Sequence, residues 1–167
     1  MLKTEMVNKL NEQLNLEAFS SNLYLQMSAW CSNNAFVGAA KFFREHAAEE
    51  SEHMMRLFNY LDGTGAQPII GSIESPEHAF SSLKDVIEKA YTHEQHITEC
   101  INELVDEALQ RKDYPTFNFL QWYVAEQHEE EKLFKDMIDR ILLVGNSGEG
   151  LFLVDKEFGN TPTDTSN

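Results

Sequence analysis

Four acidic residues occupy positions where amphipathic helices would normally bury apolar side chains. They are Glu17, Glu50, Glu94 and Glu130, and His53 follows Glu50 by three residues. Burying an ionised carboxylate costs several kcal/mol, so a cluster of four must either be protonated or hold cations. Two divalent ions would balance the four negative charges. Carboxylates with a single imidazole suit Fe(II) or Mn(II), with Zn(II) as a further possibility.

The elements that must position these residues are predicted by the distribution of glycine and proline. Long stretches contain neither, and in each of them apolar residues recur in alternating steps of three and four. Ser82 with Asp85, and Asp113 with Pro115, are typical starts of a helix. The pattern predicts four long helices and a short fifth one before a polar tail at 159–167, with bounds of about 4–32, 36–61, 82–110, 114–144 and 148–157. The expected fold is an all-α, antiparallel four-helix bundle that forms one domain over residues 1–167.

The four acidic residues should lie at one height in this bundle. Glu17 and Glu50 are equally distant from a turn at residues 33 and 34, and Glu94 and Glu130 from a turn near residue 112. The segment 63–80 can span roughly 60 Å if extended, so it can run back along the bundle as a long crossover. Glu50 and Glu94 then differ in height by only about 3 Å. These heights predict a dinuclear centre bridged by Glu50, with Glu130 as a second candidate bridge.

Other residues near this height have two interpretations each. Tyr24 lies two helical turns from Glu17, where it would either pack in the core or act as a redox partner. Gln127 faces inward beside Glu130. Trp122 is expected in the core or at an interface. Three further acids, Glu49, Glu126 and Glu129, would form a third cation site if they meet, and a hydrated surface if they do not.

The remaining histidines and the cysteines offer weaker signals. His46 has no acidic partner on its own helical stripe, so packing or contact with solvent is expected. No constellation is expected for the others, His78, His93, His96 and His128. The two cysteines, Cys31 and Cys100, provide neither a disulfide framework nor a paired metal-binding spacing.

The overall charge indicates the kind of partner. Thirteen basic and 28 acidic residues give a net charge of −15, which repels nucleic acid and attracts cations. No apolar run has the ~18 residues of a membrane helix, and the first residues contain no apolar core of a secretory signal. The cytoplasm is the expected compartment, with no membrane or nucleic-acid partner.

Over nearly its whole length, the chain resembles the bacterial non-haem ferritins, in particular those of the ferritin A type. The most specific segments are 114–134, 26–31 and 147–151. The resemblance implies a first iron site formed by Glu17, Glu50 and His53, and a second formed by Glu50, Glu94 and Glu130. It implies a third site formed by Glu49, Glu126, Glu129 and Glu130. It also places Tyr24, Trp122 and Gln127 beside the centre.

Differences from three other branches of the ferritin-like superfamily argue against membership of those branches. Gln127 stands where bacterioferritins have the glutamate of a second E-x-x-H, and Ser51 stands where they have a haem-ligating methionine, so no haem is expected. Two distant cysteines argue against the rubrerythrins. The short fifth helix and the acidic charge argue against the mini-ferritins that coat DNA.

The function implied is iron storage and detoxification. Fe(II) would be oxidised by dioxygen or peroxide, and ferric oxyhydroxide would accumulate in a shell of 24 subunits. The apolar residues 151–154 would pack at an interface between subunits. Two alternatives stay open, namely a passive container that holds redox-silent metal or no metal, and a smaller shell that protects DNA.

Overall fold

The structure is a computed structural model that describes residues 2–162. Five helices follow one another, and residues 2–162 contain no β-strand. Their bounds are α1 Thr4–Asn33, α2 Val37–Gly63, α3 Leu83–Gln110, α4 Tyr114–Val144 and α5 Gly148–Phe158. The predicted all-α bundle is confirmed, and each predicted helix end agrees within two residues. Only residues 159–162 of the predicted polar tail fall within the described part.

Side-chain caps explain where three of the helices begin. The backbone N–H of Asp85 donates to Ser82 Oγ at 3.1 Å, and that of Thr116 donates to Asp113 Oδ1 at 3.3 Å. At the start of α5, the N–H of Gly150 donates to the Ser147 hydroxyl at 3.2 Å. Each cap pairs an N–H group that has no partner inside the helix. The start signals read from the sequence for α3 and α4 are therefore confirmed.

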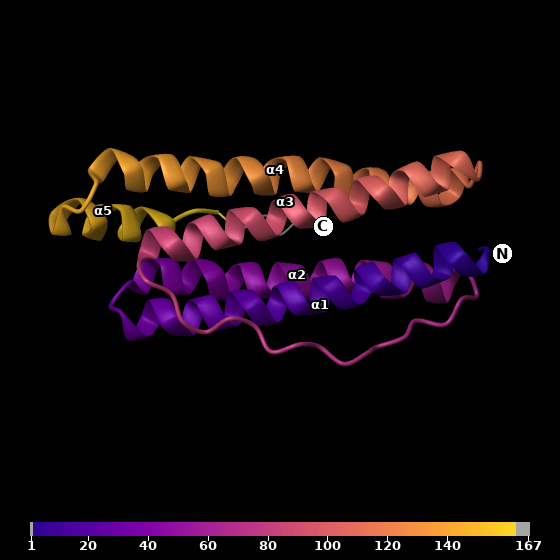
Figure 1. Ribbon diagram of the computed structural model, residues 1–167, viewed down its shortest axis with the longest axis horizontal. Coiled ribbons are helices and arrows are strands. Elements are labelled where there is room, and N and C mark those ends of the chain that lie inside the picture. Colours follow the sequence, from indigo (N-terminus) through magenta and orange to yellow (C-terminus); the bar gives the residue numbers. More distant parts are fainter. Residues whose placement is uncertain (1, 163–167) are drawn as a thin grey trace.

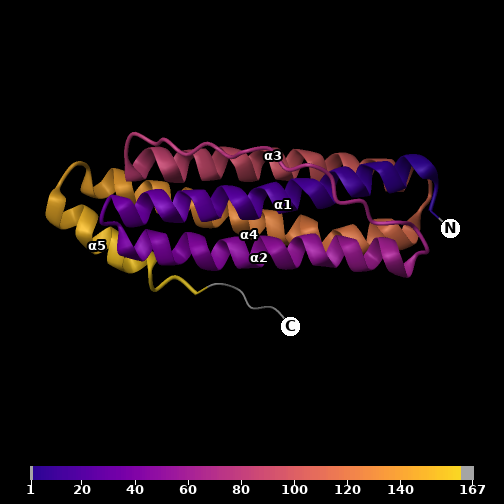
Figure 2. The same cartoon turned by 90° about the horizontal axis from the view of Figure 1, so that it is seen from below.

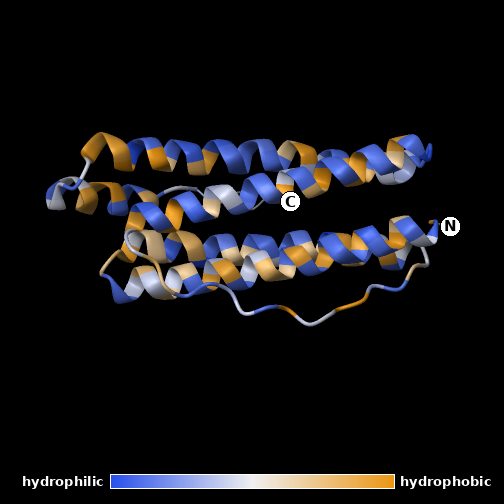
Figure 3. Cartoon of the chain, in the orientation of Figure 1, coloured by the Kyte–Doolittle hydropathy of each residue, from blue (hydrophilic) through white to orange (hydrophobic). Residues whose placement is uncertain are grey.

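The four long helices form two antiparallel hairpins, α1 with α2 and α3 with α4 (Figure 1). The segment between α2 and α3 runs the length of the bundle, so α3 starts at the same end as α2 (Figure 1). Hydrophilic and hydrophobic residues alternate along the long helices, and none of the helices in residues 2–162 is apolar over a length that would cross a membrane (Figure 3).

Helix α5 lies against one end of α2 (Figure 2). The first turn of α2 lacks a side-chain cap of its own, and Asp155 of α5 provides one. Its carboxylate accepts the N–H groups of Gly38 at 2.9 Å and Ala39 at 2.8 Å. The contact requires a glycine, because a Cβ atom on Gly38 would lie 1.8 Å from the carbonyl oxygen of Asp155. One buried carboxylate thus fixes the fifth helix to the bundle.

The core consists of two apolar clusters with a polar layer between them. One cluster, at the α5 end, includes Tyr24, Ala47, Ala90 and Phe134. The other includes Leu14, Leu57, Ile97 and Tyr123. On every long helix, the sequence between these two sets contains one of the four acidic residues singled out above. The four acids therefore lie at a common height, as predicted.

Candidate metal centre

The four carboxylates come from the four long helices, and all are buried. The exposed fractions of Glu17, Glu50, Glu94 and Glu130 are 1%, 3%, 1% and 5%. The alternative of an ordinary solvated position is thereby excluded for each of them.

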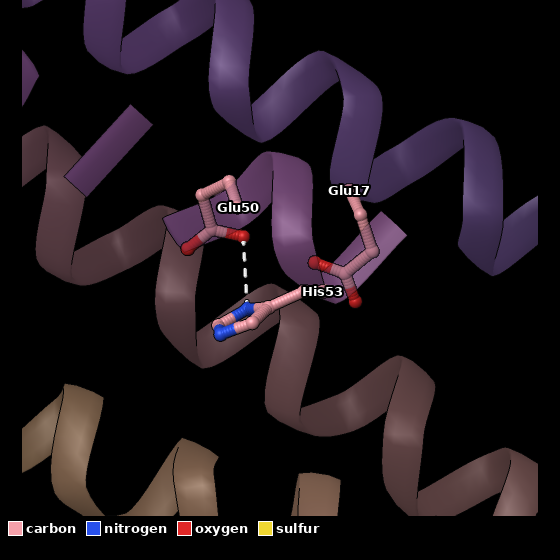
Figure 4. Close-up of side chains that lie close together, drawn as sticks. All are labelled: Glu17, Glu50 and His53. Atoms are coloured by element: carbon pink, nitrogen blue, oxygen red, sulfur yellow. Dashed lines mark ion pairs between the residues drawn. The ribbon is translucent and has the colours of Figure 1, made fainter. Parts of the chain in front are cut away.

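Glu17, Glu50 and His53 form one compact group (Figure 4). One ligand atom from each lies within 4.8 Å of the others. Three-residue spacing puts Glu50 and His53 on the same face of α2, with His53 Nδ1 3.3 Å from Glu50 Oε2, and Glu17 reaches them from α1. Such a group offers two carboxylates and one imidazole to a single ion.

Gln13 orients the Glu17 carboxylate, a contact that sequence reasoning missed. Its side-chain amide donates to Glu17 Oε1 at 2.8 Å, and both side chains are buried. The two residues lie one turn apart on α1, which is the spacing that could have revealed the pair.

Glu94 receives hydrogen bonds from two of the three residues that were expected beside the centre, Tyr24 and Gln127. The hydroxyl of Tyr24 donates to Glu94 Oε1. The amide of Gln127 donates to Glu94 Oε2 at 2.9 Å and to the Glu94 carbonyl at 3.3 Å. Tyr24 and Gln127 thus hold one carboxylate in place, and Tyr24 also packs in the core.

His46 corrects a sequence-based expectation. Its Nε2 lies 2.7 Å from Glu130 Oε2, and its Nδ1 lies 3.0 Å from Glu49 Oε2. The expectation that His46 meets no acid was wrong, because it considered partners only along its own stripe, whereas Glu130 comes from α4. His46 Nδ1 and Glu49 Oε1 are buried and lack a well-oriented hydrogen bond within the described residues. Such atoms fit a site that is completed by a proton on the imidazole or by a metal ion.

His93 also has a partner that the sequence did not indicate. Its Nε2 lies 2.7 Å from Ser20 Oγ, and its ring meets that of Tyr24 edge-on at 6.1 Å. Burial lowers the pKa of His93 to about 4, so it is neutral at physiological pH. This histidine supports the packing of α1 against α3.

The acids of the predicted third site lie on a common groove, and their role as a cation site stays a prediction. Glu49, Glu126 and Glu129 line one groove together with His46 and Glu130. Glu126 also approaches the first group, with its Oε1 3.8 Å from His53 Nε2. The groove therefore continues directly from the buried centre.

Trp122 flanks His53 at the edge of this centre. The two rings meet edge-on with centroids 5.1 Å apart, and the guanidinium of Arg56 lies 4.3 Å from the centroid of the Trp122 ring. This aromatic side chain restricts the position of the imidazole.

Burial controls the protonation of the carboxylates. It raises the pKa of Glu17 to about 8, with the charge of Glu50 adding to the effect, and that of Glu94 to about 7, with Glu130 adding. Burial and the charges of Glu94 and Glu130 raise the pKa of Glu50 well above its ordinary value. Binding of divalent ions would displace these protons and supply the missing positive charge.

Glu130 behaves differently because of His46. Burial alone would raise the pKa of Glu130, but the charge and hydrogen bond of His46 outweigh burial and lower it. Burial correspondingly disfavours the charged form of His46, yet Glu130 and Glu49 raise the pKa of the imidazole well above its ordinary value. His46 and Glu130 therefore form a buried ion pair.

Carboxylates with one or two imidazoles, and no thiolate among them, define a helical-bundle protein whose core could hold a hard or borderline divalent metal. Residues 7–144 match the family model for the ferritin-like domain. The chain is 60% identical to a bacterial non-heme ferritin of Escherichia coli O6:H1, covering 98% of this chain and 99% of that protein.

Solved structures agree with this match. A ferritin of Chlorobium tepidum is 49% identical with a TM-score of 0.86, covering 94% of this chain and 97% of the other. An open-pore ferritin of Archaeoglobus fulgidus is 35% identical with a TM-score of 0.95, covering 96% and 98%. The chain belongs to the ferritin family, and its function is iron storage.

Proposed function

We propose that this ferritin oxidises Fe(II) at the buried centre before storing it. The observation behind the proposal is that four carboxylates, one from each long helix, gather with His53 at one height in the core. Glu17, Glu50 and His53 would hold one Fe(II) ion. Glu50, Glu94 and Glu130 would hold the second, so that Glu50 is shared.

The electrons of the oxidation balance when two Fe(II) ions react with one dioxygen molecule. Each Fe(II) loses one electron, and dioxygen accepts both electrons and two protons to leave as hydrogen peroxide. Peroxide can act as oxidant in the same way. The protein supplies geometry and charge balance, because the carboxylates lose protons as the cations bind and are held by Gln13, Tyr24 and Gln127. When dioxygen is instead reduced fully to water, three Fe(II) ions would supply three of the four electrons, and Tyr24, whose hydroxyl donates to Glu94, would supply the fourth together with its phenolic proton.

Ferric ions would leave the centre along the adjoining groove. Glu49, Glu126, Glu129 and Glu130 would form a third cation site there. His46 would add an imidazole that the resemblance did not include, once the bound cation displaces its proton. The groove has the acidic character that attracts a trivalent ion.

We further propose that the whole chain works as one ferritin-like domain in a cytoplasmic shell of 24 subunits. Exposed apolar side chains support the assembly, since Leu143 is 87% and Phe152 is 70% exposed at the α5 end. Apolar surface of this kind marks contacts between proteins. Size-exclusion mass separates a 24-subunit shell from the 12-subunit alternative.

The proposed oxidation is tested by Glu50→Ala and His53→Ala in stopped-flow absorbance with Fe(II) in air. Both variants should lose the fast phase and keep the assembled shell. Glu52→Ala is the matched control, because this neighbour of both residues is exposed. Unchanged fast oxidation in both variants would refute the site. A wild-type protein that takes up Fe(II) without oxidising it would support the passive-container alternative.

A further inference from the structure

Arg56 of α2 places its guanidinium over the ring of Trp122 of α4, beside the proposed iron centre. The central carbon of the guanidinium lies 4.3 Å from the centroid of the Trp122 ring. The same ring meets that of His53 edge-on, with centroids 5.1 Å apart. Indole is one of the most easily oxidised side chains. An oxidisable ring thus lies one contact away from a proposed iron ligand, with a positive charge next to it.

Two of the acids beside this stacked pair are directed to histidines. Three acids line the groove that contains the guanidinium and the indole, Glu49, Glu52 and Glu126. Glu126 Oε1 lies 3.8 Å from His53 Nε2. Glu49 Oε2 lies 3.0 Å from His46 Nδ1. The guanidinium is therefore placed to interact with the electron-rich face of the indole as a cation–π contact.

The charge of Arg56 is also felt inside the bundle. Burial raises the pKa of Tyr123 well above its ordinary value and the charge of Glu17 adds to the effect, whereas the charge of Arg56 opposes it. Tyr123 is buried, and its ring lies 4.8 Å from that of Trp122. Because Coulomb interactions weaken with distance, a charge that acts on Tyr123 acts more strongly on the indole that it contacts.

A cation in this position makes the indole harder to oxidise. The contact is attractive because the face of the neutral ring is electron-rich. Once the indole has lost an electron its ring is positive, and the contact becomes a repulsion between two charges only 4.3 Å apart. The guanidinium therefore stabilises the reduced indole and destabilises its radical cation.

Tyr24 lies in surroundings that favour its oxidation. Its ring is fully buried, and its hydroxyl donates to Glu94. That carboxylate can accept the phenolic proton as the electron leaves, so the resulting radical is neutral. His46 also approaches the ring, at 5.5 Å between centroids, but Glu130 balances the charge of this imidazole.

We propose that Arg56 raises the reduction potential of Trp122 and so directs the one-electron oxidation beside the iron centre to Tyr24. The inference rests on the proposed function, in which Tyr24 supplies the fourth electron and a proton when dioxygen is reduced to water. Without the charge of Arg56, Trp122 would supply that electron to the partly reduced dioxygen and would release its indole proton. Arg56 is thus a positioning residue that acts through Trp122.

Freeze-quench electron paramagnetic resonance during Fe(II) oxidation in air tests this routing, with ring-deuterated tyrosine or tryptophan to identify the radical. Arg56→Gln should raise the ratio of tryptophan to tyrosine radical by at least about tenfold, because a unit charge at this distance is worth more than that factor. Arg56→Lys keeps the charge and should restore the wild-type ratio. Arg44→Gln is the matched control, since it removes an equal charge from an exposed position about 18 Å away along α2. All three variants should keep the fast phase of Fe(II) oxidation.

Photo-oxidation of the assembled, iron-free protein separates this inference from the iron chemistry. Light, ruthenium tris-bipyridine and persulfate generate a one-electron oxidant, and mass spectrometry measures the oxidised product at each tryptophan. Trp30, which is half-buried like Trp122 and stacks on Phe36, is the internal reference. Arg56→Gln should raise the ratio of product at Trp122 to product at Trp30, whereas Arg56→Lys and Arg44→Gln should leave this ratio unchanged.

The results that would overturn the inference are specific. It fails if Arg56→Gln leaves the iron-free ratio unchanged, or if Arg56→Lys behaves as Arg56→Gln does, because shape rather than charge would then protect the ring. It also fails if the wild type gives a tyrosyl radical but Tyr24→Phe/Arg56→Gln gives no tryptophan radical. A wild type without a tyrosyl radical would contradict the proposed role of Tyr24, and the iron-free ratio would still decide whether Arg56 protects Trp122.

Discussion

Two buried groups in this bundle combine carboxylates with an imidazole, and they balance their charge in different ways. In the group of Glu17, Glu50 and His53, burial raises the pKa of both carboxyls, so ionising them costs free energy. In the group of His46, Glu49 and Glu130, the imidazole takes up a proton and the carboxyl of Glu130 stays ionised. The same residue types thus form two different groups. The first needs external cations to balance its carboxylates, whereas in the second the protonated imidazole of His46 balances the charge of Glu130.

The difference follows from which helices supply the acids. Glu50 faces two other acids, Glu94 and Glu130, across the polar layer, and Glu17 faces Glu50. His46 lies between Glu49 of its own helix and Glu130 of α4, with short distances to both. Glu130 also faces Glu50, which connects the proposed iron centre to the adjoining groove.

The largest expected effect is on the rate of Fe(II) oxidation, which should fall much more when a ligand of the first group is removed than when a residue of the second is removed. Glu17→Ala should slow the fast phase by about 100-fold or more, because a direct ligand should matter at least as much as the indirect contacts that cost 10- to 100-fold. Glu49→Ala should slow it far less, since Glu49 belongs only to the groove. Stopped-flow absorbance at matched shell concentration measures both, and equal losses would contradict the division.

Removing His46 tests the buried ion pair. His46→Ala leaves Glu130 without its partner, and breaking a buried pair in this way costs about 3–5 kcal/mol. The iron-free protein should therefore unfold at a lower temperature in calorimetry. His46→Ala/Glu130→Gln should recover much of the loss, because the second change removes the uncompensated charge. No recovery would mean that packing against Phe42 and Phe134, rather than charge, explains the effect.

The pH dependence of stability separates the groups further. The folded-state pKa values of Glu17 and Glu94, about 8 and about 7, lie above the ordinary 4.5, so the native state binds protons more tightly than the unfolded state. Their contribution is complete below pH 4.5 and is lost as the pH rises through about 7 to 8. The pKa of Glu130 is lowered, so Glu130 stabilises the folded state at pH values above its ordinary pKa, and this contribution is lost as the pH falls.

Thermal unfolding of the iron-free protein between pH 5 and pH 9 measures this dependence. The wild type should lose several kcal/mol of stability toward pH 9, at about 1.4 kcal/mol for each unit by which a pKa is raised. Glu17→Gln should flatten the curve, while the exposed Glu12→Gln should leave it unchanged. A wild type that is more stable at pH 9 than at pH 5 would show that Glu17 is not protonated in the empty centre.

The smallest effect is expected at Tyr24. Tyr24→Phe removes the hydroxyl that donates to Glu94 but keeps the ring in the core. Iron binding should survive, and the fast phase should slow by less than about tenfold, because the lost contact is indirect. A tyrosyl radical signal trapped during wild-type turnover should be missing in this variant. Its persistence would assign the electron to another aromatic residue.

The sequence alone determined the helices and the height of the acids. Breaker-free stretches, caps at Ser82 and Asp113, and apolar periodicity depend on neighbours within a few residues, so local rules predicted them. The inward positions of Glu17, Glu50, Glu94 and Glu130 followed from the same helical period. Their metal-binding role stays a prediction.

Only the tertiary structure decided which side chains from different helices meet. The helical period gives the face on which His46 lies but not that Glu130 of α4 lies opposite it. In the same way, no local pattern shows that Asp155 of α5 caps α2, or that Tyr24 of α1 donates to Glu94 of α3. These contacts depend on the rotation and offset of whole helices, which the packing of the entire core sets rather than any short stretch of sequence.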